Sequence, residues 1–153
     1  MEALTRTDWH RLTVSQARRC ALVLAVLTLV FAARVLAQFL QFVHPTGSLP
    51  SFADFHGSAV PYAWLLPVQL AVVLVMAGIT IAVAEGRVAP RPARGRQLFA
   101  FGTLYCAVTL SRLVVGFAVA GAPPWFQAWL PAAFHFVLAG FVLALAAFHL
   151  RRL

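Results

Sequence analysis

The stretch Arg34-Val35-Leu36-Ala37-Gln38-Phe39-Leu40-Gln41-Phe42-Val43-His44-Pro45 places a positive charge within a long apolar run. On a helix, Arg34, Gln38 and Gln41 follow an i, i+4, i+7 spacing, so they form one narrow polar stripe. The residues between them are apolar. The stripe therefore predicts a helix in apolar surroundings that needs polar neighbours from elsewhere in the chain.

The composition places the whole chain in the membrane-protein class. Of its 153 residues, 62% are hydrophobic and 10% are charged, and the mean hydropathy is +0.87. Soluble domains carry about 25% charged residues. A soluble protein of this size would leave much of this apolar surface in water, whereas a bilayer covers it. We expect an all-α integral membrane protein, a four-helix transmembrane bundle formed by one membrane domain over 1–153.

Four apolar runs set the boundaries within this domain. Each run is close to the ~20 residues that cross ~30 Å of hydrocarbon. We expect a cytoplasmic tail at 1–19, spans at 20–43, 62–84, 98–120 and 126–150, connections at 44–61, 85–97 and 121–125, and a cytoplasmic end at 151–153.

The basic residues predict the orientation. All 12 are arginine, which with the Ala, Leu and Val content suggests a GC-rich bacterium. Outside the spans they occur only in the tail, the 85–97 linker and the C-terminus. Because cytoplasmic loops are enriched in positive charge, both termini are expected in the cytoplasm of a bacterial inner membrane. Residues expected to contact cytoplasmic lipid headgroups are Arg18, Arg19, Arg87, Arg91, Arg94 and Arg96, and those expected to anchor the opposite boundary are Trp64, Trp125 and Trp129. This placement of charge excludes nucleic acid as a partner and makes membrane lipids one.

The connection after the first span is expected to contain a further short helix. Ser48–Gly57 has Pro50 in a position that suits a first helical turn and Gly57 in one that suits a C-terminal stop. Its aromatic residues share a face, so the helix is expected to lie in the outer interface. Asp54 on this helix is the one acid of the chain expected near the outer ends of the spans.

A polar layer crosses the bundle at one depth. Arg34, Gln69, Arg112 and His135 come from four different spans, each about seven to nine residues from the outer boundary, or ~10–14 Å deep at 1.5 Å per residue. The residues expected to form this layer or to bind a ligand there are Arg34, Gln38, Gln41, Gln69, Tyr105, Thr109, Arg112, His135 and Asp54.

Three interpretations of the buried arginines stay open. They snorkel outward to lipid phosphate and exposed carbonyls, or they face a cavity that holds an anionic or carbonyl group, or they pair with Asp54. A ligand of the second kind would be a lipid head, a quinone, a haem propionate or a partner's carboxylate. A haem held by His135 with His44 or His56 is a weaker hypothesis. No catalytic or metal site is predicted.

No motif for phosphate, dinucleotide or zinc binding is present, and no pair of acids is placed for acid–base catalysis. We therefore expect an accessory or structural subunit of a larger membrane complex, such as a bioenergetic one, with other membrane-protein subunits as partners. The alternative is a binding protein for an anionic, quinone, haem or lipid ligand at the outer polar layer. A small membrane enzyme or maturation factor acting on a lipidic substrate is the third reading. The sequence is assigned to no family.

Overall fold

The computed structural model describes residues 6–57 and 60–150, with side chains from residue 16 onward except that of Pro124. Regular structure in this part of the chain is helical, without strands. The helices are α1 (Arg6–Val43), α2 (Phe52–His56), α3 (Tyr62–Ala84), α4 (Pro92–Ala118), α5 (Pro124–Gln127) and α6 (Trp129–Leu150). The predicted cytoplasmic end at 151–153 lies outside the described residues.

Within residues 6–57 and 60–150, four helices are long and apolar enough to cross a membrane: α1 from Gln16 onward, α3, α4 and α6. The all-helical, four-span prediction is confirmed to that extent. Helix α3 has the bounds expected for the second span, whereas α1 and α4 begin before their expected spans, at Arg6 and Pro92. Proline suits the first turn of a helix because it lacks the N–H that a helix leaves unpaired there, which explains the early start of α4.

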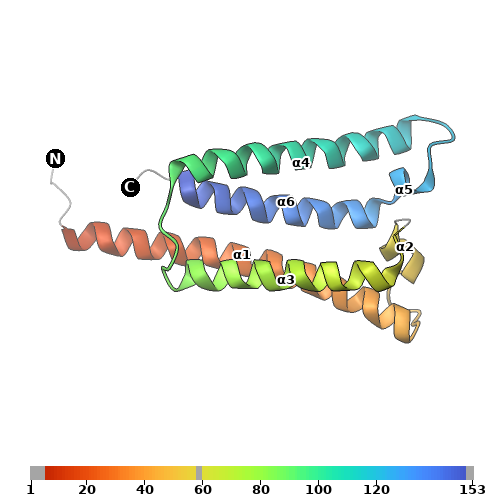
Figure 1. Cartoon of the computed structure of the whole chain (residues 1–153), viewed down its shortest axis with the longest axis horizontal. Coiled ribbons are helices and arrows are strands. Elements are labelled where there is room, and N and C mark those ends of the chain that lie inside the picture. Colours follow the sequence, from red (N-terminus) through yellow and green to blue (C-terminus); the bar gives the residue numbers. More distant parts are fainter. Residues whose placement is uncertain (1–5, 58–59, 151–153) are drawn as a thin grey trace.

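The four long helices form two antiparallel hairpins that meet along α1 and α6 (Figure 1). Helix α1 packs against α3 within the first hairpin, and α4 packs against α6 within the second. Since α1 also packs against α6, the order across the molecule is α3, α1, α6, α4. We call the end that contains the 85–91 connection the basic end and the opposite end, with 44–61 and 119–128, the loop end.

Small residues on α4 set its close contact with α5 and α6. Gly95, Gly102, Thr109 and Gly116 recur every seventh residue and are all buried. A Cβ atom on Gly102 would come within 2.8 Å of Leu143, and one on Gly116 within 2.5 Å of the Phe126 carbonyl oxygen. Small residues let helix backbones approach closely where there is no hydrophobic drive between helices, as in a bilayer. The glycines of α4 therefore let its backbone lie close to α6 and to the short helix that precedes it.

The outward faces of the long helices are apolar. Trp64 and Leu74 on α3 are each 72% exposed, and Leu104 on α4 is 64% exposed. Contiguous apolar surface of this kind is rare on soluble monomers. It fits surroundings of lipid or of partner helices.

Candidate functional site

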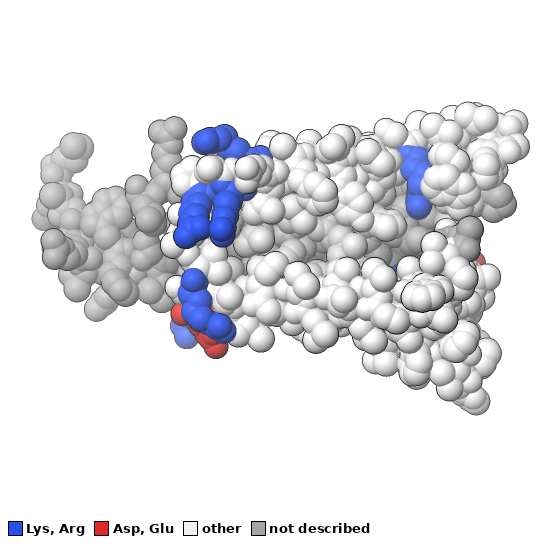
Figure 2. Space-filling view, in the orientation of Figure 1, with Lys and Arg blue, Asp and Glu red and all other residues white. Residues whose placement is uncertain are grey.

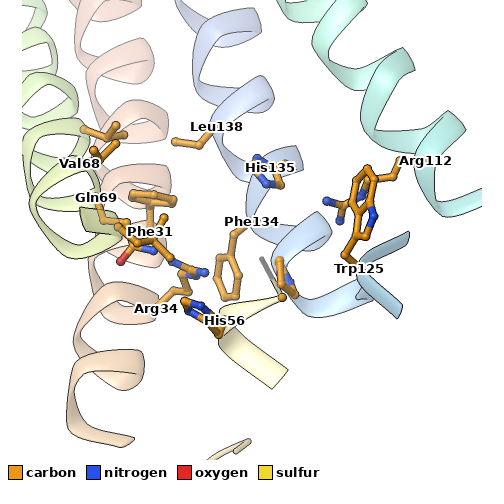
Figure 3. Close-up of a pocket in the computed structure, with 14 residues that line it drawn as sticks. Phe31, Arg34, His56, Val68, Gln69, Arg112, Trp125, Phe134, His135 and Leu138 are labelled. Carbon is orange, nitrogen blue, oxygen red and sulfur yellow. The ribbon is translucent and has the colours of Figure 1, made fainter. Parts of the chain in front are cut away.

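A cavity of ≈480 Å³ lies between the two hairpins near the loop end. Arg34, Gln69, Arg112 and His135, predicted to share one depth, all line it, although they come from four different helices. Figure 3 shows Arg34, Gln69 and Phe31 on one side of this space and Arg112 with Trp125 on the other, with Phe134 and His135 of α6 between them. The structure therefore brings the core of the predicted polar layer to one place.

Arg34 enters the cavity from the polar stripe of α1. Its side chain is 8% exposed. Nη2 donates to the Phe55 carbonyl oxygen of α2 at 3.0 Å, and the guanidinium carbon lies 5.4 Å from the centre of the Phe134 ring. The buried Nε has no hydrogen-bond partner among the described residues. Arg34 Nη2 thus links α2 to α1, while Arg34 Nε has no partner in the described structure.

Arg112 is held from α4 in a parallel way. Nη2 donates to the Ala128 carbonyl oxygen at 3.2 Å, and the guanidinium carbon lies 5.6 Å from the Trp125 ring centre. Its Nε is also buried without a partner in the described part of the chain. Each arginine therefore donates through Nη2 to a carbonyl oxygen of the loop end and lies over an aromatic face. The buried Nε–H of each has no partner among the described residues.

Asp54 contacts neither arginine. Its carboxylate accepts hydrogen bonds from the Ser51 amide at 3.0 Å and the Ser51 hydroxyl at 2.7 Å, while the Asp54 amide donates to the Ser51 hydroxyl at 3.2 Å. This reciprocal capping box satisfies the N-terminus of α2. Among the side chains of residues 16–57 and 60–150, the ion pair that forms is between Arg87 and Glu85, at the basic end. No described acid therefore balances Arg34 or Arg112.

The three glutamines of the predicted layer take different positions. Gln69 Nε2 donates to Gln38 Oε1 at 3.1 Å, which links α3 to α1. Gln41 faces the loop instead: its Nε2 lies 2.8–3.0 Å from the carbonyl oxygens of Thr46, Leu49 and Pro50, and its Oε1 accepts the Thr46 amide at 2.7 Å. Gln41 thus shapes the loop, whereas Gln69 lines the cavity.

The second hairpin contributes a phenol–imidazole pair. Tyr105 of α4 hydrogen-bonds through its hydroxyl to His135 Nδ1 of α6 at 2.5 Å. Tyr105 does not line the cavity, but it fixes the His135 ring that does. Thr109, also predicted for the layer, is buried in the seam between α4 and α6.

The other histidines lie apart from this pair. His56 lines the cavity, with Nδ1 buried and unpartnered in the described structure, and stacks on Phe52. His44 is exposed in the loop, and His149 lies at the basic end, where its Nδ1 accepts the Arg91 amide at 3.1 Å. The described residues hold no cluster of three or more metal-ligating side chains.

The remaining predicted contacts lie on the surface. All six arginines expected at lipid headgroups, Arg18, Arg19, Arg87, Arg91, Arg94 and Arg96, are exposed. Basic side chains gather at the basic end in Figure 2. Trp64 and Trp129 are exposed at the loop end, whereas Trp125 also forms a cavity wall beside Arg112.

Aromatic walls of the cavity were missed from the sequence. Phe31 precedes Arg34 by three residues, and Phe134 adjoins His135. Because residues three apart share a helix face, the spacing of Phe31 is the signal that could have identified it. Trp125 carried no such signal because its position depends on the turn before α6.

Comparison of the chain with models of known protein families, with curated proteins and with solved structures gave no match.

Proposed function

We propose that this chain is a multi-pass membrane protein whose cavity binds a ligand carrying an anionic or carbonyl group. The observation that carries the proposal is the pair of guanidinium groups of Arg34 and Arg112, which come from different helices to line one cavity and have no acid of the described residues beside them. A buried charge without a counter-ion is costly in a medium of low dielectric constant. Arginine binds carboxylate, phosphate and carbonyl oxygens through several N–H groups, so such a ligand offsets that cost.

Outward snorkelling is the competing account for these arginines. A snorkelling side chain keeps its charged head in water or among lipid headgroups. Arg34 is instead 8% exposed, and its Nη2 is engaged with the Phe55 carbonyl oxygen of α2. These contacts support the cavity reading for Arg34 in particular.

We further propose that the basic end lies in the cytoplasm of a bacterial inner membrane, with both termini on that side. The exposed arginines at that end and the exposed Trp64 and Trp129 at the other support this orientation. In that orientation α2 lies in the outer interface, and the cavity opens from the outer leaflet.

The role of accessory subunit in a larger membrane complex is a second candidate. The favouring observation is the strongly exposed apolar face of α4, which includes Leu104 and Phe117. Partner helices would cover such a face, and so would lipid. The ligand proposal does not exclude this role.

Both proposals are tested by isolation in mild detergent followed by mass spectrometry of everything that co-purifies. We expect a small molecule at a fixed ratio to the wild-type chain, retained by the Arg96→Leu control and lost from an Arg34→Leu, Arg112→Leu double variant. Arg96 is exposed on the same helix as Arg112 and does not line that cavity. An identical set of small molecules in wild type and double variant would contradict ligand binding.

The same preparation tests the two narrower hypotheses. An absorption spectrum without a Soret band removes a haem as the ligand. Recovery of the chain solely as a monomer or homo-oligomer would contradict the subunit role, whereas a stoichiometric second polypeptide would support it.

A further inference from the structure

A second cavity lies nearer the basic end than the first. This cavity, of ≈630 Å³, is lined by three of the four long helices, with Ile79 from α3, Phe101 from α4 and Leu145 from α6 among its apolar walls. Its polar lining residues are Arg94, Gln97 and His149. Helices α3 and α4 are the two outer helices of the row and do not pack as a pair. Figure 2 shows the surface hollowed between the two hairpins. We call the space between α3 and α4, floored by α6, the trough.

One face of α6 contributes to both cavities. Leu138 lines the first and Leu145 the second. Residues seven apart lie on the same face of a helix, here ~10 Å apart at 1.5 Å per residue. His135 and Leu145 are ~15 Å apart by the same rise, which is about half of the ~30 Å hydrocarbon core. The apolar floor below the polar groups is therefore as long as one leaflet is thick.

The polar end of the trough is rich in donors. Arg34 Nε and Arg112 Nε lack partners. The Tyr105 hydroxyl lies 2.5 Å from His135 Nδ1, and when it donates there the ring proton of a neutral His135 is on Nε2. Among the cavity-lining side chains, Gln69 Oε1 is a buried acceptor without a partner in the described structure, and it suits a hydroxyl group.

We infer that the trough binds one chain of an acidic lipid. The phosphate or carboxylate of this lipid lies in the space between Arg34 and Arg112, and its apolar chain runs over Leu138 toward Leu145. This inference rests on the proposed function and specifies its ligand. Two guanidinium charges without a described acid select an anion over a neutral quinone carbonyl, because only an anion balances their charge.

The acyl chain of the lipid explains why the trough has an aliphatic floor as well as two arginines. A free anion would use the arginines alone and leave the aliphatic floor of α6 uncovered. An acyl chain covers this floor and packs against its aliphatic side chains. A bilayer lipid enters sideways, through the opening between α3 and α4.

Native mass spectrometry of the detergent-solubilised full chain tests this inference with defined probes. The probes are oleoyl lysophosphatidic acid, octanoyl lysophosphatidic acid, oleate, oleoyl lysophosphatidylcholine and inorganic phosphate. We expect oleoyl lysophosphatidic acid and oleate to bind at least about tenfold more tightly than the zwitterionic lipid, a difference of ~1.4 kcal/mol. Arg34→Gln with Arg112→Gln should abolish this preference, and Arg96→Gln should keep it.

A second pair of variants tests the position of the chain. Ile79→Trp adds bulk within the trough, whereas Leu74→Trp adds it on the exposed face of the same helix. We expect Ile79→Trp to weaken the oleoyl lipid about tenfold and to leave the octanoyl lipid unchanged, while Leu74→Trp leaves both unchanged. Circular dichroism and thermal unfolding of each variant show that it is folded.

Each contrary outcome has one meaning. Inorganic phosphate that binds as tightly as the oleoyl lipid, or equal effects of Ile79→Trp on both chain lengths, would overturn the lipid inference while leaving a ligand at the arginines. Lipid binding unchanged by Arg34→Gln with Arg112→Gln would overturn the proposed function itself. If Ile79→Trp is misfolded, the comparison of oleoyl with octanoyl lipid on the wild-type chain decides, and equal affinity contradicts the inference.

Discussion

Within one helical stripe, Arg34, Gln38 and Gln41 make contacts of three different kinds. Arg34 lines the cavity, Gln38 joins α1 to α3 through Gln69, and Gln41 holds the loop after α1. The stripe itself could be predicted because helical spacing depends on sequence alone. The separate roles could not, because they depend on where the loop and α2 fold back.

At this scale, Gln41→Leu should loosen the loop that follows α1. The Thr46 amide donates to Gln41 Oε1. The net value of such a hydrogen bond is about 0.5–1.4 kcal/mol, so its loss should speed hydrogen exchange of the Thr46 amide roughly 2- to 10-fold. Amide hydrogen exchange at Thr46 measures this effect. Gln127→Leu, at an exposed position of α5, is the control and should leave the rate unchanged. A protected Thr46 amide in Gln41→Leu would contradict the assigned contact.

The buried Gln38–Gln69 pair should couple α1 to α3. Hydrogen bonds between helices in membranes are worth about 0.6 kcal/mol on average and up to about 1.7 kcal/mol. A double-mutant cycle with Gln38→Leu and Gln69→Leu should give a coupling energy in that range, measured by reversible unfolding in mixed micelles. Strictly additive effects would show that the 3.1 Å contact is not energetically significant.

At the scale of elements, two glycines differ in how closely a neighbouring segment approaches them. A Cβ atom on Gly116 would come within 2.5 Å of the Phe126 carbonyl oxygen, whereas one on Gly78 would meet no atom within 4 Å. The position of Gly116 in a seven-residue repeat of small residues could be found in the sequence. The identity of the facing backbone could not, because the turn at 119–128 sets it.

Gly116→Ala and Gly78→Ala should therefore change stability in opposite directions. We expect Gly116→Ala to lower the free energy of unfolding by about 1–3 kcal/mol through overpacking. Gly78→Ala should raise it by about 0.5–1 kcal/mol, because alanine is the better helix former. Unfolding of both variants in mixed micelles gives the comparison, and a stable Gly116→Ala would rule out the close approach of α4 to this turn.

At the scale of the whole molecule, the sequence predicted the helical class and the four long apolar helices. Apolar runs near the length of a bilayer span, separated by polar turns, allow few alternatives. The order α3, α1, α6, α4 could not be predicted, since it depends on which helix faces match. That order opens the space between α3 and α4, and with it the cavity.

The proposed orientation predicts which loops a membrane-impermeant maleimide reaches in intact cells. In a chain with Cys20→Ala and Cys106→Ala, we expect Ser48→Cys to react from outside and Ala89→Cys to react only after the cells are opened. Both positions are exposed, one at the loop end and one at the basic end. The reverse pattern would place the loop end in the cytoplasm and contradict the positive-inside assignment.

The central claim is that Arg34 and Arg112 hold the acidic head of a lipid in the cavity between the two hairpins. An experimental structure of the chain purified from its own membrane tests this claim most directly. We expect density for a head group within about 3 Å of a guanidinium nitrogen, continued by a chain beside Leu138 toward Leu145. A trough closed by direct packing of α3 against α4, or guanidinium groups that point out to the bilayer surface, would contradict it.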